Sequence, residues 1–218
     1  MKRPTSPLIA VILTLTAAAG TRAGQLAPGE TGRGPDFYYG FEPPVDGEVV
    51  HTVSAPFEES VMWQGTLYFQ QGTLTQRVYR EDDGRLAFLY LYDETAAANA
   101  TADVVSLAAT GFTGFTTDAY ADVFFPPVVS RSADGDRITS VDGGEGDAGL
   151  LIRTNATAYV LNGTGAAFTA MVRFQGNGGG SLDQPVTLGT FRPVPEPSSA
   201  ALLVAAATPA LRRRRTRR

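Results

Sequence analysis

Carboxylates are the side chains of this sequence with the clearest capacity for chemistry. The chain has 22 Asp and Glu, 18 Lys and Arg, one histidine and no cysteine, which excludes disulfides, thiol catalysis and Cys-ligated metals. The acidic runs at 58–59, 81–83 and 93–94 offer an acid and a base for glycoside hydrolysis, which needs two carboxyl groups at a defined separation. Adjacent carboxylates in loops are normally solvated. We therefore expect no catalytic residues, and a carboxylate-dependent glycan-active enzyme is an alternative.

A second acidic segment, 134–147, has the composition of a calcium loop. Its glycines allow tight turns in which carboxylate oxygens converge, as a hard cation such as Ca²⁺ requires. The segment is not an EF-hand, because it lacks Asp-x-Asp-x-Asp-Gly and the glutamate at position twelve. The alternative is an acidic loop between two strands that binds nothing. The candidate ligands for Ca²⁺, the one cofactor that the sequence suggests, are Asp134, Asp136, Asp142, Glu145 and Asp147.

Other catalytic groups are scarce. His51 is the only histidine, and it lies in a run of strand-forming residues, 49–53. We interpret it as a partly exposed strand residue rather than a general base or a metal ligand. The chain contains no Gly-x-Ser-x-Gly elbow, no His-x-x-x-His pair and no phosphate-binding glycine loop. Serine and zinc hydrolases are therefore poorly supported.

Aromatic residues give a binding alternative. Trp63, Phe41 and the runs 37–39 and 124–125 would stack on sugar rings if they formed one exposed patch. A body without disulfides also needs large apolar side chains for its core, and we expect most of these rings to be buried there. The alternative function is a glycan-binding or calcium-dependent adhesion module.

The elements that must position these residues are strands. The region between the termini has short runs of β-forming residues separated by glycines and turn pairs, and no helical stripe. This pattern predicts an all-β fold, an antiparallel β-sandwich or a jelly-roll-like body. We expect strands near 48–54, 61–70, 73–80, 85–92, 102–108, 137–141, 149–153, 156–161, 167–174 and 186–191.

The clearest local feature is a hairpin. Residues 74–79 and 86–92 are joined by Glu81-Asp82-Asp83-Gly84, where the Asp-Gly pair suits a turn with a positive φ. The second strand is apolar on both faces, so we expect it to be central and buried. Two glycine-rich stretches are expected to lack structure: a flexible leading segment, 24–36, and a loop or late linker, 175–184.

The N-terminus has the order of a secretory signal peptide. Lys2 and Arg3 precede the apolar run 8–19, and small residues follow up to Ala23, which is the charged, hydrophobic and small-residue order of such signals. We assign 1–23 to the signal peptide, with cleavage after Ala19 or Ala23. An uncleaved signal anchor is the alternative, and both interpretations predict export.

The C-terminus carries an apolar run followed by arginines. Residues 198–211 are 14 residues without charge, about 21 Å long as a helix, whereas a bilayer core is roughly 30 Å thick. The segment is too short to span the bilayer core as a permanent anchor without mismatch, although a stop-transfer helix stays an alternative. The residues expected to form a basic stop on the cytoplasmic side are Arg212, Arg213, Arg214, Arg215, Arg217 and Arg218.

With an export signal in front, this tail resembles the PEP-CTERM sorting signal of exported bacterial proteins. The resemblance rests on the motif, the apolar stretch and the arginines, and the motif residues are Val194, Pro195, Glu196 and Pro197. It implies processing by a membrane-embedded exosortase and delivery to the cell surface or an extracellular polysaccharide matrix. We therefore divide the chain into a β-rich extracellular domain, 37–193, and a sorting signal, 194–218, which would hold the protein in the membrane until it is processed.

The body itself resembles an uncharacterised ectodomain that recurs with PEP-CTERM tails. The matching pieces are 72–80, 84–90, 111–118 and 151–157. This likeness implies secretion and surface sorting, and it implies no activity. Residues 24–194 carry nine basic and 21 acidic residues, a net charge of −12, so we expect no nucleic-acid partner. The expected partners are the secretion translocase, an exosortase-type enzyme and extracellular polysaccharide.

Overall fold

The computed structural model describes residues 25–33, 45–63, 65–98, 101–122, 128–145, 147–161, 166–175 and 181–195. The regular structure of these residues is entirely β, as the sequence predicts. No helix among them has the length and apolar character required to cross a membrane. The expected signal peptide, 1–23, the hydrophobic sorting helix and the arginine tail lie outside the described residues.

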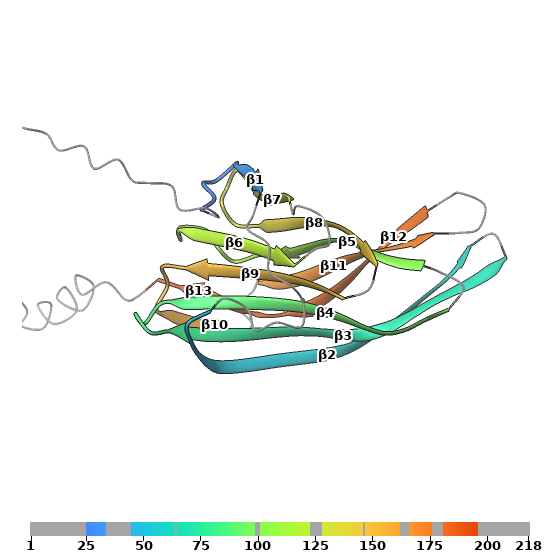
Figure 1. The fold of residues 1–218 in the computed structure, drawn as a ribbon, viewed down its shortest axis with the longest axis horizontal. Coiled ribbons are helices and arrows are strands. Elements are labelled where there is room, and N and C mark those ends of the chain that lie inside the picture. Colours follow the sequence, from blue (N-terminus) through green and yellow to red (C-terminus); the bar gives the residue numbers. More distant parts are fainter. Residues whose placement is uncertain are drawn as a thin grey trace, which may run out of the picture.

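Two antiparallel sheets pack face to face in a β-sandwich (Figure 1). The five-stranded sheet has the order β2 (Gly47–Trp63), β3 (Thr66–Glu81), β4 (Leu86–Ala98), β9 (Ala148–Thr154) and β6 (Thr117–Asp122). The six-stranded sheet has the order β1 (Thr31–Arg33), β7 (Val128–Arg131), β8 (Ile138–Glu145), β5 (Thr101–Ala109), β11 (Ala167–Gln175) and β12 (Ser181–Gly189). A separate pair is formed by β10 (Ala158–Leu161) and β13 (Phe191–Val194).

The core lies between the two sheets and is rich in aromatic rings. The rings of Tyr90 and Phe168, from opposite sheets, have centroids 5.1 Å apart. Those of Phe88 and Phe112 meet edge to face at 5.8 Å, a favourable geometry for aromatic pairs. These rings are fully buried, so the sandwich is held by apolar burial without disulfides.

The predicted hairpin is present as β3 and β4. Arg80 pairs with Leu86 across the turn, and Gly84 adopts the expected positive φ of 85°. Strand β4 lies between β3 and β9, and both of its faces are buried. Phe88 and Tyr90 point into the main core, whereas Leu89 belongs to a smaller apolar cluster on the other face of the sheet. The prediction of a central, buried strand is confirmed.

The strands around 48–70 differ from the prediction. We expected separate strands at 48–54 and 61–70, but β2 runs without interruption from Gly47 to Trp63, and the chain reverses at Gly65, which has a φ of 80°. Pro56 lies inside β2 and has no N–H to donate to a sheet. It is tolerated because β2 is the edge strand, so one side of its backbone needs no partner.

The leading segment is packed where the sequence predicted flexibility. Leu26 is buried, and its N–H donates to the carbonyl of Thr117 at 3.0 Å. Gln25 forms an isolated bridge with Asp118, and β1 pairs with β7. The glycine-rich composition predicted flexibility. The segment is nevertheless held in place, because the apolar side chain of Leu26 is buried in the core.

The expected linker and last strand also need correction. The stretch 175–184 contains the end of β11 and the beginning of β12, with Gln175 paired to Ser181; residues 176–180 lie outside the described part of the chain. The strand expected at 186–191 is divided at the buried Thr190. The reason is that β12 pairs with β11, while β13 leaves that sheet and pairs with β10.

Candidate functional site

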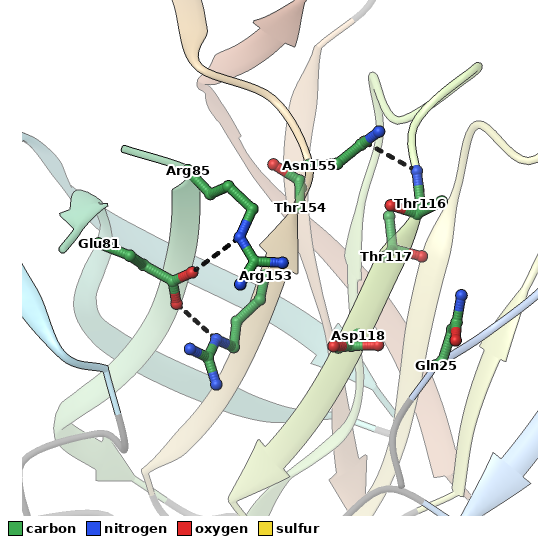
Figure 2. Close-up of a pocket in the computed structure, with 9 residues that line it drawn as sticks. All are labelled: Gln25, Glu81, Arg85, Thr116, Thr117, Asp118, Arg153, Thr154 and Asn155. Atoms are coloured by element: carbon green, nitrogen blue, oxygen red, sulfur yellow. Dashed lines mark hydrogen bonds and ion pairs between the residues drawn. The ribbon is translucent and has the colours of Figure 1, made fainter. Parts of the chain in front are cut away.

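A small polar pocket lies where strands of the five-stranded sheet end (Figure 2). Its volume is about 130 Å³. The walls come from the β3–β4 turn, the end of β9, the beginning of β6 and the leading segment. The lining residues are Gln25, Glu81, Arg85, Thr116, Thr117, Asp118, Arg153, Thr154 and Asn155.

Strand register explains why the charged groups meet. Arg153 is paired with Asp118 on one side and with Ala87 on the other. Residues that are paired across a sheet project from the same face, so these three share the face opposite the core. Ala87 is small and buried, and Arg153 therefore extends past it to Glu81 on β3. The Arg153 Nε to Glu81 Oε1 distance is 2.5 Å.

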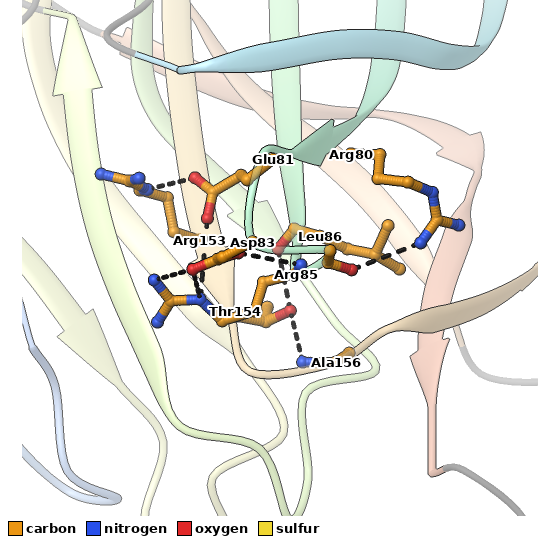
Figure 3. A network of polar contacts seen from close by, with 9 residues as sticks. Arg80, Glu81, Asp83, Arg85, Leu86, Arg153, Thr154 and Ala156 are labelled. Carbon is orange, nitrogen blue, oxygen red and sulfur yellow. Dashed lines mark hydrogen bonds and ion pairs between the residues drawn. The ribbon is translucent and has the colours of Figure 1, made fainter.

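The hairpin turn adds a second arginine (Figure 3). Arg85 donates from Nε to Asp83 Oδ2 at 2.6 Å, and its own N–H donates to Asp83 Oδ1. Its Nε also lies 4.0 Å from Glu81 Oε2. The hydrogen bonds from Arg85 hold the pKa of Asp83 below its ordinary value. Burial opposes the charge of Arg153, but Glu81 and Tyr120 outweigh it and raise the pKa of Arg153.

This arrangement does not provide an acid and a base. Glu81 is 5% exposed, and each of its carboxylate oxygens faces a guanidinium group. Glu81 is therefore engaged with arginines, whereas glycoside hydrolysis needs a carboxyl group that can reach the leaving group.

The other acidic runs lie at the far end of the same sheet. Glu59 is paired with Gln70, and the buried side chain of Gln70 donates to Glu94 Oε2 at 2.8 Å and also to Tyr92. Burial raises the pKa of Asp93, and the nearby carboxylate of Asp147 raises it further. The structure therefore brings 58–59 and 93–94 toward one end of the sheet and places 81–83 at the other.

The acidic segment 134–147 is not one loop. Strand β8 occupies 138–145 and separates Asp134 and Asp136 from Asp147 by roughly 20 Å of extended chain. The side chains of Asp142 and Glu145 lie outside the description. No three Asp, Glu or His side chains of the described residues are grouped so that they could hold a metal ion. Of the predicted ligands, Asp134 and Asp136 thus precede the strand and Asp147 follows it.

Asp134 and Asp136 have structural partners of their own. Asp134 Oδ1 accepts hydrogen bonds from the Ser132 hydroxyl at 2.5 Å and from the Asp136 N–H at 3.1 Å, and these bonds lower its pKa. Asp136 Oδ1 accepts from the Gly111 N–H and the Thr113 hydroxyl. Asp147, at the other end, accepts from the Glu94 N–H at 2.9 Å. Each described carboxylate stabilises a turn or a strand end.

His51 and Trp63 lie against other rings. His51 is exposed on β2, with its ring 4.4 Å from that of Phe191, which agrees with its interpretation as a strand residue. Trp63 is partly buried and packs against the core, 5.8 Å from Tyr68. The other aromatic residues proposed for sugar stacking, 37–39, 41 and 124–125, lie outside the described residues.

Two residues of the sorting motif can be placed. Val194 is the last residue of β13 and pairs with Ala158, whereas Pro195 is exposed. Glu196, Pro197 and all six tail arginines lie beyond the described residues. The folded body therefore extends to Val194, one residue further than the predicted boundary at 193.

Few features of the sequence indicated this pocket. Its residues come from four separate segments, and only Glu81 belonged to a predicted acidic run. One signal was available: Arg153 ends the apolar run Leu150–Ile152 in a buried strand, and an arginine at such a position needs a partner. Comparisons with protein-family models, with curated proteins and with solved structures found no match to this chain.

Proposed function

We propose that this chain is an exported, non-enzymatic β-sandwich protein that is delivered to the cell surface or the extracellular matrix by its C-terminal segment. The observation that carries the proposal is the position of the motif. Strand β13 ends at Val194, and Pro195 is exposed. The Val-Pro-Glu-Pro sequence thus begins at the last residue of the last described strand, so an exosortase-type enzyme would read Pro195 and the residues after it without unfolding the described sandwich.

The N-terminal end supports export in the same way. Packing begins at Gln25 and Leu26. Removal of a signal peptide after Ala19 or Ala23 would leave every packed residue of the described part of the chain in place. At both chain ends the proposed routing segment then adjoins the first or last residues of the described fold.

The proposed non-enzymatic role is supported by the contacts that the described carboxylates make within the protein. Glu81 is enclosed by two arginines, and Asp134 and Asp136 are used in turns. The acidic body would be repelled by anionic lipid, so the hydrophobic segment 198–211 is the part that would hold the chain in the membrane before processing.

The experiment is expression of the full chain in a bacterium that has an exosortase and in an isogenic strain without it. Mass spectrometry of the surface fraction should find a C-terminus near the motif in the first strain only. Alanine replacement of Pro195, Glu196 and Pro197 together should leave the protein in the membrane fraction.

A matched control changes an exposed proline and an exposed glutamate elsewhere in the chain. The variant P56A/E58A changes Pro56 and Glu58 on edge strand β2 and should be processed like the wild type. Recovery of an intact Arg218 end on surface protein would contradict processing and favour the stop-transfer anchor. Equal release of the triple-alanine variant would contradict recognition of the motif.

A further inference from the structure

The pocket beside Glu81 has the size of a single ring. It measures about 130 Å³, and a cavity of about 150 Å³ in another protein holds benzene. It lies at the end of the five-stranded sheet, and Figure 2 shows its side chains converging from β3, β9, β6 and the leading segment. A ligand with about the bulk of benzene would fill it, so a hexopyranose, which has twice as many non-hydrogen atoms, would lie partly outside the pocket.

The charges of the lining cancel. Arg85 and Arg153 face Glu81 and Asp118, and the closest contacts are between these groups or with the adjacent Asp83. An anion would gain from the arginines and lose to the carboxylates by similar amounts. A zwitterion would have to break the 2.5 Å pair of Glu81 and Arg153. The lining therefore favours neither an anion nor a zwitterion over a neutral ligand.

The lining nevertheless keeps hydrogen-bonding capacity. A guanidinium has five N–H donors, and the bonds from Arg85 and Arg153 to carboxylates use only part of that number. Gln25 and Asn155 are exposed, and each amide offers both donors and acceptors.

We propose that this pocket binds one neutral sugar unit. A pyranose has hydroxyl groups around a six-membered ring, and each hydroxyl both donates and accepts. This matches a polar lining with donors and acceptors on all sides, zero formal charge and no aromatic residue. The proposal goes beyond the proposed function, because sorting by the C-terminal segment requires no ligand.

The test is saturation-transfer NMR, followed by titration, on the purified full-length chain. The probes are the methyl glycosides of glucose, galactose and mannose, with glycine betaine and acetate as zwitterion and anion. At least one methyl glycoside should bind, and acetate and betaine should not. Replacement R85A should raise the Kd about tenfold, the usual effect of losing one charge-assisted hydrogen bond.

The matched control is R173A. Arg173 is also an arginine in an ion pair with an aspartate, Asp183, at 2.8 Å, but it lies on β11 in the other sheet, so its variant should bind with unchanged Kd. Gln25 is exposed, so Q25A keeps the fold and should also weaken binding several-fold. Absence of binding by every glycoside at tens of millimolar, an unchanged Kd in both R85A and Q25A, or preference for acetate or betaine would overturn the proposal.

Discussion

The side-chain amide of Gln76 makes both hydrogen bonds of the Phe191 backbone. Gln76 Oε1 accepts from the Phe191 N–H at 2.7 Å, and Gln76 Nε2 donates to the Phe191 carbonyl at 2.9 Å. The amide thus takes the place of a neighbouring strand at the beginning of β13, where the chain has left the six-stranded sheet after β12. Because Gln76 is fully buried, no water can take over these bonds.

Replacement of Gln76 by alanine should therefore destabilise the protein by about 2–4 kcal/mol, because two buried backbone groups lose their partners. Urea unfolding followed by tryptophan fluorescence measures the change. The control Q184A alters a half-buried glutamine on β12 and should cost less than about 1 kcal/mol. Equal unfolding midpoints for Q76A and the wild type would show that the pair contributes nothing.

A second prediction concerns Arg131, which is 5% exposed. Its guanidinium donates to four carbonyl groups, those of Leu26, Phe112, Phe115 and Gly135, at 2.8–3.1 Å. Lysine is a point donor without this fork, so R131K should destabilise the fold by about 2–4 kcal/mol.

The same replacement should release the leading segment. Amide hydrogen exchange at Leu26 should become faster in R131K than in the wild type, since the Leu26 carbonyl loses its partner. R173K, which changes the exposed pair with Asp183, should alter stability by less than about 1 kcal/mol. Unchanged exchange at Leu26 would contradict the role assigned to Arg131.

A third prediction concerns pH. The pKa of Asp93 is raised, first by burial and then by the Asp147 carboxylate. A carboxyl group whose pKa is higher in the folded than in the unfolded state binds its proton more tightly when folded. It therefore lowers stability as pH rises from its unfolded value of about 4 through its folded value.

The variant D93N should consequently be more stable than the wild type at pH 7, and this advantage should shrink below about pH 4, where Asp93 is protonated in both states. Thermal unfolding midpoints at pH 3 and pH 7 measure the difference. E48Q, at an exposed position of β2, is the control and should show no such trend. If D93N were stabilised more at pH 3 than at pH 7, the raised pKa assigned to Asp93 would be contradicted.

A fourth prediction concerns Gly72, where two strands and a ring approach closely. A Cβ at this position would lie 2.1 Å from the Asp93 carbonyl oxygen and 2.8 Å from the ring of Phe57, which stacks on Tyr92 at 5.3 Å. G72A should destabilise the fold by about 1–3 kcal/mol through overpacking. G32A is the control, because its Cβ would meet only Leu26 at an ordinary 3.5 Å. Differential scanning calorimetry should separate the two variants clearly.

Local pattern was sufficient to predict the β-rich character of the chain and its clearest hairpin. The Asp83-Gly84 pair specifies a turn with positive φ, and the apolar residues 86–92 indicate a strand buried on both faces. These features depend on neighbours within a few residues. The export signal and the sorting motif are likewise contiguous in the sequence, and they stay predictions because their residues lie mostly outside the described structure.

Only the tertiary structure decided which distant residues meet. Gln76 and Phe191 are 115 positions apart, and Arg153 reaches Glu81 because β4 places the small Ala87 between them. The division of 134–147 by β8 and the docking of Leu26 likewise depend on contacts between residues far apart in the sequence. Alternation determines which face of a strand is apolar, but strand order is set by burial summed over the whole sandwich. The sequence by itself therefore determined the β-rich character and the β3–β4 hairpin, and long-range packing determined the limits of several strands and the pocket.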